Sequence, residues 1–253
     1  MNITFPPLNA FAALLAVFAC LLPCPCADAM TPTNQFFATG PQAALEIAIR
    51  ADDVARMADA IAQGASVNAT GKFRITPLMV AVDAQSPRAV QALLKAGALP
   101  NARAEDRNGP VSLAVKSCRA KPNGRDIMLA VFASGGDPNT RQPDGDPVIM
   151  RFILDRDPAG LQLMKSLGAD LDVRDRGGDP LITNVAMSQD WDMVLALIEL
   201  GAQVDYENGK STQPLSKALS LRYPGADSPL YPYKLKVWQI LKDKGLPVQP
   251  LKP

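Results

Sequence analysis

The chain has 253 residues, of which 47% are hydrophobic, 20% charged and only 6% aromatic, a globular composition without a large aromatic core. Its formal net charge of +1 predicts no general attraction to nucleic acid, because nucleic-acid-binding proteins usually combine a basic balance with a groove-entering motif. The chain has no histidine, which excludes a Ser-His-Asp triad, a Cys-His pair and a histidine-ligated metal site, and it has no phosphate-binding glycine loop. We therefore expect neither an enzyme nor a bound cofactor.

The chain opens with an apolar run over residues 11–22 that is too short to span a bilayer comfortably. Ala27-Asp28-Ala29 supplies the small-x-small pattern of a signal-peptidase site, although residues 1–10 contain no Lys or Arg. This pattern predicts a signal peptide over residues 1–29 and a periplasmic or secreted protein with no transmembrane span after processing. The alternative is a buried helix of a cytoplasmic domain.

A second possibility for the same segment is a lipid anchor. Val17-Phe18-Ala19-Cys20 resembles a bacterial lipoprotein processing box, and an acylated Cys20 would tether the chain to a membrane. The apolar Leu21-Leu22-Pro23 that follows argues against it, because mature lipoproteins usually become polar there.

Removal of residues 1–29 would leave Cys118 as the only cysteine, so an internal disulfide is excluded. We expect Cys118 to be a small apolar residue at the end of a helix. A reactive thiol is the alternative, but no histidine is available to deprotonate it.

The rest of the chain is organised by a period of about 33 residues. Within the stretch 76–101, Thr76 can cap a helix that starts at Pro77, Ser86-Pro87 repeats this pattern for a second helix, and Gly97 can end that helix in a left-handed conformation. Each period therefore predicts a pair of helices. Glycines recur at 64, 97, 135, 168, 201 and 245, and prolines that would open first helices recur at 77, 110, 147, 180 and 214.

The residues themselves resemble ankyrin repeats. G-A-S-V-N-A at Gly64, G-A-L-P-N-A at Gly97 and T-P-L-M-V-A at Thr76 are close to the patterns of that family. The resemblance implies an all-α solenoid of about six helix-pair repeats with short hairpin loops, over residues 43–253 after a lead-in at 30–42. It also implies a protein that binds other proteins, since the family shares a scaffold and its members bind many different partners.

Two residues depart from the family pattern in the first helices. In an alignment on the prolines, Arg151 and Asn184 replace the small alanine that lets neighbouring helices approach. Because a buried unpaired charge is too costly, we expect these side chains to reach solvent on the inner face, where they are candidates for partner binding together with Lys217.

The third and sixth units carry insertions. Residues 117–126 predict a longer polar loop. Residues 221–234 contain Tyr223, Tyr231 and Tyr233, which either fold back as a cap over the end of the array or form a contact loop for a partner. The last helix, predicted at 234–244, places Leu235, Trp238 and Leu241 on one apolar stripe.

The hairpin tips form the main candidate site. Arg103, Arg141 and Arg174 each lie six residues after a period-marking glycine, so they should align in register, with Arg107 and Arg176 nearby. They form either an ordinary solvated edge or a column that pairs with carboxylates of a partner. The acidic residues Asp144, Asp146, Asp170 and Asp172 lie at hairpin turns and helix caps, and the terminal Glu of a calcium loop is missing, so no metal site is expected.

Together these features predict a monomeric, exported protein that binds another protein. One hypothesis is an immunity-like role, in which it neutralises or shelters an exported enzyme or toxin. A second is a stabilising companion of a periplasmic enzyme, such as one that acts against oxidative stress. A third, of another class, is a structural scaffold tethered to a membrane through Cys20.

Overall fold

The computed structural model describes residues 35–204, 215–221 and 224–251, and in this part of the chain it contains twelve α-helices, one 3₁₀ turn and no strand. The predicted all-α class is confirmed. The predictions for the signal peptide, Cys20, Pro214 and Tyr223 lie outside the described residues. The helices are α1 (Gly40–Arg50), α2 (Val54–Ala62), η1 (Lys72–Arg74), α3 (Pro77–Asp83), α4 (Pro87–Lys95), α5 (Pro110–Ser117), α6 (Gly124–Ala133), α7 (Met150–Leu154), α8 (Pro158–Ser166), α9 (Leu181–Met187), α10 (Trp191–Glu199), α11 (Leu215–Ser220) and α12 (Tyr231–Asp243).

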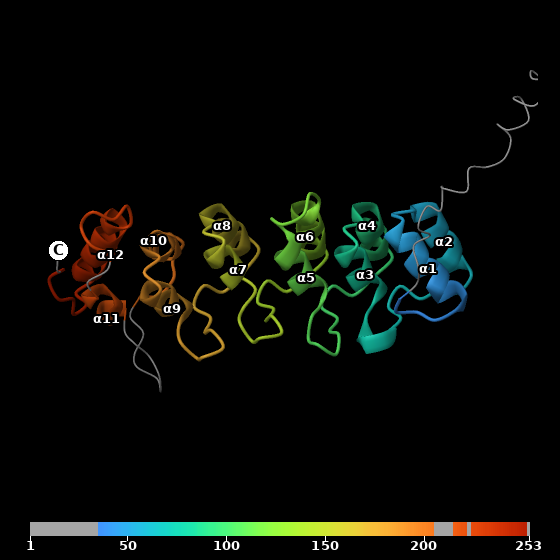
Figure 1. Cartoon of the computed structure of the whole chain (residues 1–253), viewed down its shortest axis with the longest axis horizontal. Helices are drawn as coiled ribbons and strands as arrows, with labels where there is room; N and C mark the ends of the chain where they lie inside the picture. The colour runs from blue at the N-terminus through green and yellow to red at the C-terminus, as the bar shows by residue number, and fades with distance from the viewer. Residues whose placement is uncertain (1–34, 205–214, 222–223, 252–253) are drawn as a thin grey trace, which may run out of the picture. The chain divides into compact units, whose positions relative to one another are not determined.

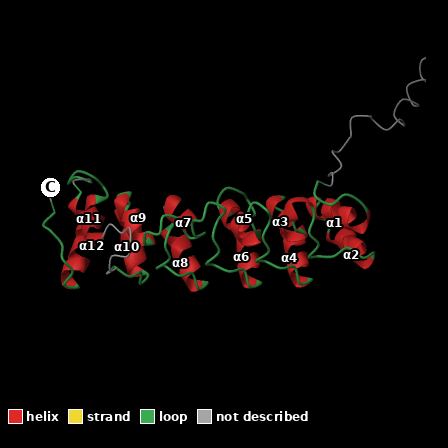
Figure 2. Ribbon diagram, turned by 90° about the horizontal axis from the view of Figure 1, so that it is seen from below, coloured by secondary structure: helices red, strands yellow, loops and turns green. Residues whose placement is uncertain are grey.

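The α-helices from α1 to α10 form packed pairs in chain order, and neighbouring pairs pack against each other through one hydrophobic core. For example, α1 contacts α2 and α3, α3 contacts α4 and α5, and α9 contacts α10 and α11 (Figure 1). Figure 2 shows the first helices of the pairs in one row and the second helices in another. The buried side chains lie between neighbouring pairs, so each unit contributes to the cores on both sides of it.

The period-marking glycines end the second helices, as predicted. All six have a positive φ, between 74° at Gly245 and 102° at Gly64. Only glycine adopts this left-handed conformation without strain, which explains why the residue recurs at this point of every unit.

The predicted helix starts are correct at some units and wrong at others. Thr76 caps α3, since its hydroxyl accepts the N–H of Met79 at 3.4 Å. Ser86 makes no such bond to α4. The N–H of Ala89 instead donates to Asp52 Oδ1 of the preceding unit at 2.7 Å, so the cap of α4 is a contact between units.

The alignment that placed Arg151 and Asn184 at the position of the small alanine is wrong by one residue. Pro77 is the first residue of α3, whereas Pro180 is the N-cap of α9 and Pro147 precedes the start of α7 at Met150. Both of these prolines close a hairpin through an isolated bridge, with Arg174 and Arg141 respectively. Helix α9 therefore begins one residue after its proline and α7 three residues after its proline. Counted back from the first residues of the second helices, Pro87 of α4, Pro158 of α8 and Trp191 of α10, the position of Ala81 falls one residue later in both units than the alignment on the prolines places it.

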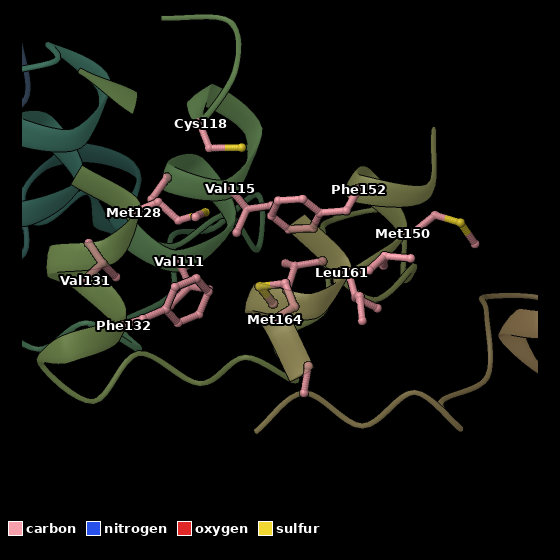
Figure 3. Close-up of a cluster of buried hydrophobic side chains, with 14 of the residues drawn as sticks. Val111, Val115, Cys118, Met128, Val131, Phe132, Met150, Phe152, Leu161 and Met164 are labelled. Carbon is pink, nitrogen blue, oxygen red and sulfur yellow. The ribbon is translucent and has the colours of Figure 1, made fainter. Parts of the chain in front are cut away.

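With the corrected register, the alanine position of the second unit, Ala81, corresponds to Phe152 in α7. Phe152 is 1% exposed, and its ring points toward Val115 of α5 (Figure 3). The chain accommodates this large ring with Gly160 in α8, because a Cβ on Gly160 would lie 2.2 Å from Phe152 Cδ1. Gly160 stands where the second unit has Ala89, so a Phe–Gly pair replaces an Ala–Ala pair.

An asparagine four residues after each of three glycines links successive units. Asn101 donates its amide to the carbonyl of Gly135 at 2.9 Å and accepts the N–H of Asp137 at 2.8 Å. Asn68 and Asn139 make the same two bonds to their following units. The G-x-x-x-N pattern therefore has a structural role, since it joins three of the units to the next unit along the hairpin side.

We expect Asn101→Ala to destabilise the protein by about 1–2 kcal/mol, because two hydrogen bonds between units are lost. Chemical denaturation followed by circular dichroism measures the effect. Gln162→Ala, at an exposed position of α8, is the matched control, and equal losses for the two variants would contradict the role of Asn101.

The turns between paired helices supply a second set of links between units. Arg156 lies between α7 and α8 with a φ of 50°, and its guanidinium donates to Asp190 and Asp192 of the next unit, both at 2.6 Å. Two charge-assisted hydrogen bonds from one guanidinium to two carboxylates fix the relative position of two units more firmly than a single exposed ion pair.

The segment before the first unit is held by a buried carboxylate. Glu46 of α1 is 1% exposed and accepts the N–H groups of Gln35, Phe36 and Phe37 at 2.8 to 3.0 Å, while Arg50 pairs with it at 3.0 Å. The Phe37 side chain is buried and belongs to the hydrophobic core. Helix α1 begins at Gly40, three residues before the predicted start of the repeat domain.

The C-terminal helix differs from the prediction in both its start and its buried face. Helix α12 begins at Tyr231, so Tyr231 and Tyr233 lie in the helix and not in a loop. Leu235 is 42% exposed, whereas Lys234, Val237 and Leu241 form the buried stripe. The prediction is correct for Leu241 and wrong for Leu235, because the aliphatic stem of Lys234 enters the core in its place, where its ammonium donates to the carbonyl of Leu221 at 2.6 Å.

Burial lowers the pKa of Lys234. Its ammonium also lies 5.7 Å from the centre of the Trp191 ring, so part of its stabilisation is a cation–π contact. On the outer side of α12, the Trp238 indole donates to the carbonyl of Gln249 at 2.8 Å, which holds the C-terminal segment against the helix.

Candidate protein-interaction surface

In the described part of the chain, four hairpins of equal length lie between the units. Each is closed by a backbone bond from its first to its fifth residue: Gly71 to Ile75, Ala104 to Asn108, Gln142 to Asp146 and Asp175 to Asp179, at 2.8 to 2.9 Å. The fourth residue of each hairpin is left-handed. It is Arg74 (φ 59°), Arg107 (φ 67°), Gly145 (φ 96°) and Gly178 (φ 87°) in chain order.

The predicted column of Arg103, Arg141 and Arg174 has a structural role in these hairpins. Each arginine donates Nη1 to the carbonyl of the left-handed residue four positions on: Arg103 to Arg107 at 3.0 Å, Arg141 to Gly145 at 2.7 Å and Arg174 to Gly178 at 2.8 Å. All three side chains remain exposed. The sequence signal for this role is the constant four-residue spacing between each of these arginines and the left-handed residue of its hairpin.

The two neighbouring arginines link hairpins to each other. Arg107 donates to the carbonyl of Pro143 in the next hairpin. Arg176 lies 4.0 Å from the carboxylate of Asp146, and its backbone N–H donates to the same carboxylate at 2.9 Å. The hairpin edge is therefore a connected row in which each tip is fixed by its neighbour, and little conformational entropy would be lost if a partner bound to it.

The predicted inner-face residues lie on α7 and α9 but do not form one cluster with the tips. Arg151 is partly exposed and forms an ion pair at 2.9 Å with Asp155, four residues later in the chain. Asn184 is half-buried, and its amide donates to Asp175 Oδ2 at 2.5 Å. It thus supports the fourth hairpin from below and lines a shallow pocket with Asp179, Thr183, Met187 and Ser188.

The other predicted residues lie further along the array. Lys217 of α11 is exposed and borders a shallow pocket between α11 and the segment 247–249. Tyr231 is half-buried at the start of α12, and Tyr233 is 39% exposed. Neither tyrosine lies in a protruding loop.

The first hairpin carries a residue that the sequence analysis did not single out for binding. Phe73 lies at its tip between Lys72 and Arg74 and is 63% exposed. It also has a left-handed φ of 57°, so this hairpin contains two consecutive left-handed residues that are not glycine. The conformation could not be read from the sequence, because neither Phe nor Arg is typical of it.

We expect Arg74→Gly to stabilise the protein by about 0.5–1 kcal/mol, since glycine relieves the left-handed strain at a cost in unfolded-state entropy. The converse change, Gly178→Ala, should destabilise it by about 1 kcal/mol through strain alone, because a Cβ there would meet no atom within 4 Å. Thermal and urea unfolding of the two variants measure both effects. Destabilisation by Arg74→Gly would show that the Arg74 side chain contributes contacts that outweigh the strain.

Cys118 follows α5 and is buried, as predicted. Burial raises the pKa of its thiol, and the carboxylates of Asp155 and Asp157 raise it further. The thiolate is thereby disfavoured, which is the opposite of what a nucleophilic cysteine requires. Over the described ranges, no three potential metal ligands come together, and no helix has the length and apolar character needed to cross a membrane.

Comparisons with known proteins agree with the repeat pattern over part of the chain. One relative is an E3 ubiquitin-protein ligase, KEG, from Arabidopsis thaliana, which is 32% identical over 114 residues. That alignment covers 44% of this chain and 7% of the ligase, so the chain spans only a small part of the length of this relative. Residues 74–105, which comprise the second helix pair and part of each flanking hairpin, match the family model for the Ankyrin repeat, a repeat that indicates a protein–protein interaction module.

Proposed function

We propose that this protein is a non-catalytic protein–protein interaction module of the cell envelope that binds an exported enzyme or toxin and neutralises or shelters it. One observation carries the proposal: Arg103, Arg141 and Arg174 are exposed, in register, and held by identical hydrogen bonds on hairpins that are joined to one another. Rigid arginines in a row present paired N–H donors at fixed spacing, which suits carboxylates on a folded partner.

The stacking of the helix pairs supports a solenoid of about six ankyrin repeats, in which the hairpin edge and the inner face are the surfaces available to a partner. We propose that residues 1–29 are a signal peptide, that residues 30–42 form a lead-in and that residues 43–253 form the repeat domain. The bonds from Glu46 to Gln35, Phe36 and Phe37 support a lead-in that is part of the folded protein.

Export can be tested without knowledge of the partner. Mass spectrometry of the mature protein from a fractionated bacterial host should show a chain that starts at Met30, without a lipid, in the periplasm or the medium. An acylated N-terminus at Cys20 would instead support the tethered scaffold. An unprocessed chain in the cytoplasm would overturn export.

The binding site is tested by affinity capture from a cell-envelope extract to which the products of neighbouring genes have been added. The variant Arg103→Glu, Arg141→Glu, Arg174→Glu should fail to retain a protein that the parent retains. The matched control carries Arg88→Glu, Lys95→Glu and Lys165→Glu, three exposed charges on second helices, and should retain it. Retention by both triple variants would move the site to Arg151, Asn184 or the tyrosines of α12.

The sign of the effect on the captured partner separates the two functional hypotheses. A partner that loses enzymatic activity on binding fits the immunity-like role. A partner that keeps or gains activity fits the stabilising companion.

A further inference from the structure

The first hairpin, Lys72-Phe73-Arg74, combines an exposed aromatic ring with a fixed backbone. The N–H of Lys72 donates to the carbonyl of Phe36 in the lead-in at 2.9 Å, and the carbonyl of Phe73 accepts the N–H of Glu105 in the second hairpin at 3.0 Å. Gly71 fits tightly against the lead-in, since a Cβ there would lie 2.6 Å from the carbonyl of Phe36. The tip is therefore held from both sides.

The exposure of Phe73 is not a consequence of a loose loop. A ring that is 63% exposed normally gains by folding back onto the surface, but the left-handed backbone at Phe73 and Arg74 directs it away. Strain of this type persists only where the surrounding structure imposes it, and it is concentrated at functional sites. The other three hairpins have Asp106, Asp144 and Gly177 at the position of Phe73, and none of them has a positive φ.

The charges around the ring are mainly positive. The tips of the first two hairpins carry Lys72, Arg74, Arg103 and Arg107 against Glu105 and Asp106. With the preceding arginine counted in each case, the second and fourth hairpins have two charges of each sign and the third has one cation against two carboxylates, so the basic excess comes from Lys72 and Arg74 of the first hairpin. Among these cations, Lys72 and Arg74 are exposed and form no ion pair with another described residue, whereas Arg103 and Arg107 donate to backbone carbonyls.

We propose that the tip Lys72-Phe73-Arg74 is the anchor of the binding surface, and that it inserts Phe73 into an apolar pocket of a partner protein whose rim carries carboxylates. This inference rests on the proposed function and specifies which end of the hairpin edge makes the central contact. A large aromatic residue seated in a desolvated pocket and surrounded by charge pairs is the usual composition of an interface hot spot. Because the tip is already rigid, insertion requires little further ordering.

The test uses a library of random displayed peptides selected on the immobilised full chain. Selected peptides should be rich in Asp and Glu next to aromatic or aliphatic residues, and their affinity should fall as salt is raised from about 50 mM to about 500 mM. Fluorescence anisotropy with the labelled peptides should give a Kd at least about tenfold weaker for Phe73→Ala and for Lys72→Glu, Arg74→Glu. Phe73→Tyr, which keeps the ring, should bind within about threefold of the parent.

Leu99→Ala is the matched control, because Leu99 is also a large exposed apolar side chain, at 60% exposure, but lies outside the tip. Peptides that bind Phe73→Ala and Leu99→Ala equally well overturn the inference. Peptides whose binding is lost only in the Arg103, Arg141, Arg174 triple variant overturn it as well, while they support the proposed function. A selection that enriches no peptide overturns the inference and counts against the proposed function too.

Discussion

Gly160→Ala is expected to destabilise the protein by about 2–3 kcal/mol, the cost of forcing extra volume into a packed core. In an exposed helix the same change would stabilise by about 1 kcal/mol, because alanine has the higher helix propensity. In α8 the new Cβ would lie 2.2 Å from Phe152 Cδ1 and 2.7 Å from Asp157 Oδ2. Neither neighbour can move freely, since the Phe152 ring is buried and Asp157 caps α8 through the N–H of Gly160 at 2.9 Å. Urea unfolding followed by circular dichroism measures the loss.

A double-mutant cycle tests whether the clash with Phe152 is the cause. Phe152→Ala alone should destabilise by about 3–5 kcal/mol through the cavity it leaves. In that background Gly160→Ala should cost clearly less than in the parent, since the contacts with the Phe152 ring are gone and only the contact with Asp157 Oδ2 remains. Ala89→Gly, at the equivalent position, should lose only about 1 kcal/mol. Equal effects of Gly160→Ala with and without Phe152 would contradict this account.

The sequence predicted those features that depend on local spacing. The left-handed glycines, the pairing of helices and the Thr76 cap each follow from a few adjacent residues, and all were confirmed. Phe152 and Gly160 show where such reasoning fails, because one large side chain and one missing side chain compensate each other across two helices. The register of α7 and α9 was missed for a related reason: proline fits both the first helical position and the N-cap, so proline spacing alone does not fix where a helix begins.

The candidate surface also combines features that follow from local spacing with features that depend on the folded backbone. The register of Arg103, Arg141 and Arg174 followed from counting residues, whereas their bonds to the left-handed residue of each hairpin required the backbone geometry. Lys234 lies outside the predicted apolar stripe of the last helix, yet it is fully buried beside Leu221 and Trp191. Hydrophobic periodicity assigns a lysine to a polar face because of its charge. It does not take into account that the long aliphatic stem can be buried while the ammonium bonds to a carbonyl.

The second large effect is expected at Glu46. Glu46→Gln should destabilise the protein by about 2–4 kcal/mol, because a carboxylate that accepts three backbone N–H groups is replaced by an amide with a single acceptor oxygen. The new NH₂ group would also face N–H donors of the lead-in. The amide protons of Gln35, Phe36 and Phe37 should lose their protection against hydrogen exchange, since their acceptor is weakened.

The pH dependence of the protein's stability tests whether the charge of Glu46 causes this stabilisation. Burial acts to raise the pKa of Glu46, but the three backbone bonds and Arg50 outweigh it, and the pKa lies below its ordinary value of 4.5. Between the folded pKa and 4.5 the unfolded chain binds more protons than the folded chain, so stability rises with pH through this window and is lost as pH falls through the folded pKa. The stability difference between the parent and Glu46→Gln should therefore be full above this window and shrink as the pH is lowered into it. Glu199→Gln, at an exposed position of α10, should leave the parent's pH profile unchanged. If the stability of Glu46→Gln follows the same pH profile as the parent down to acid pH, the hold of this side chain on the lead-in depends on its shape and not on its charge.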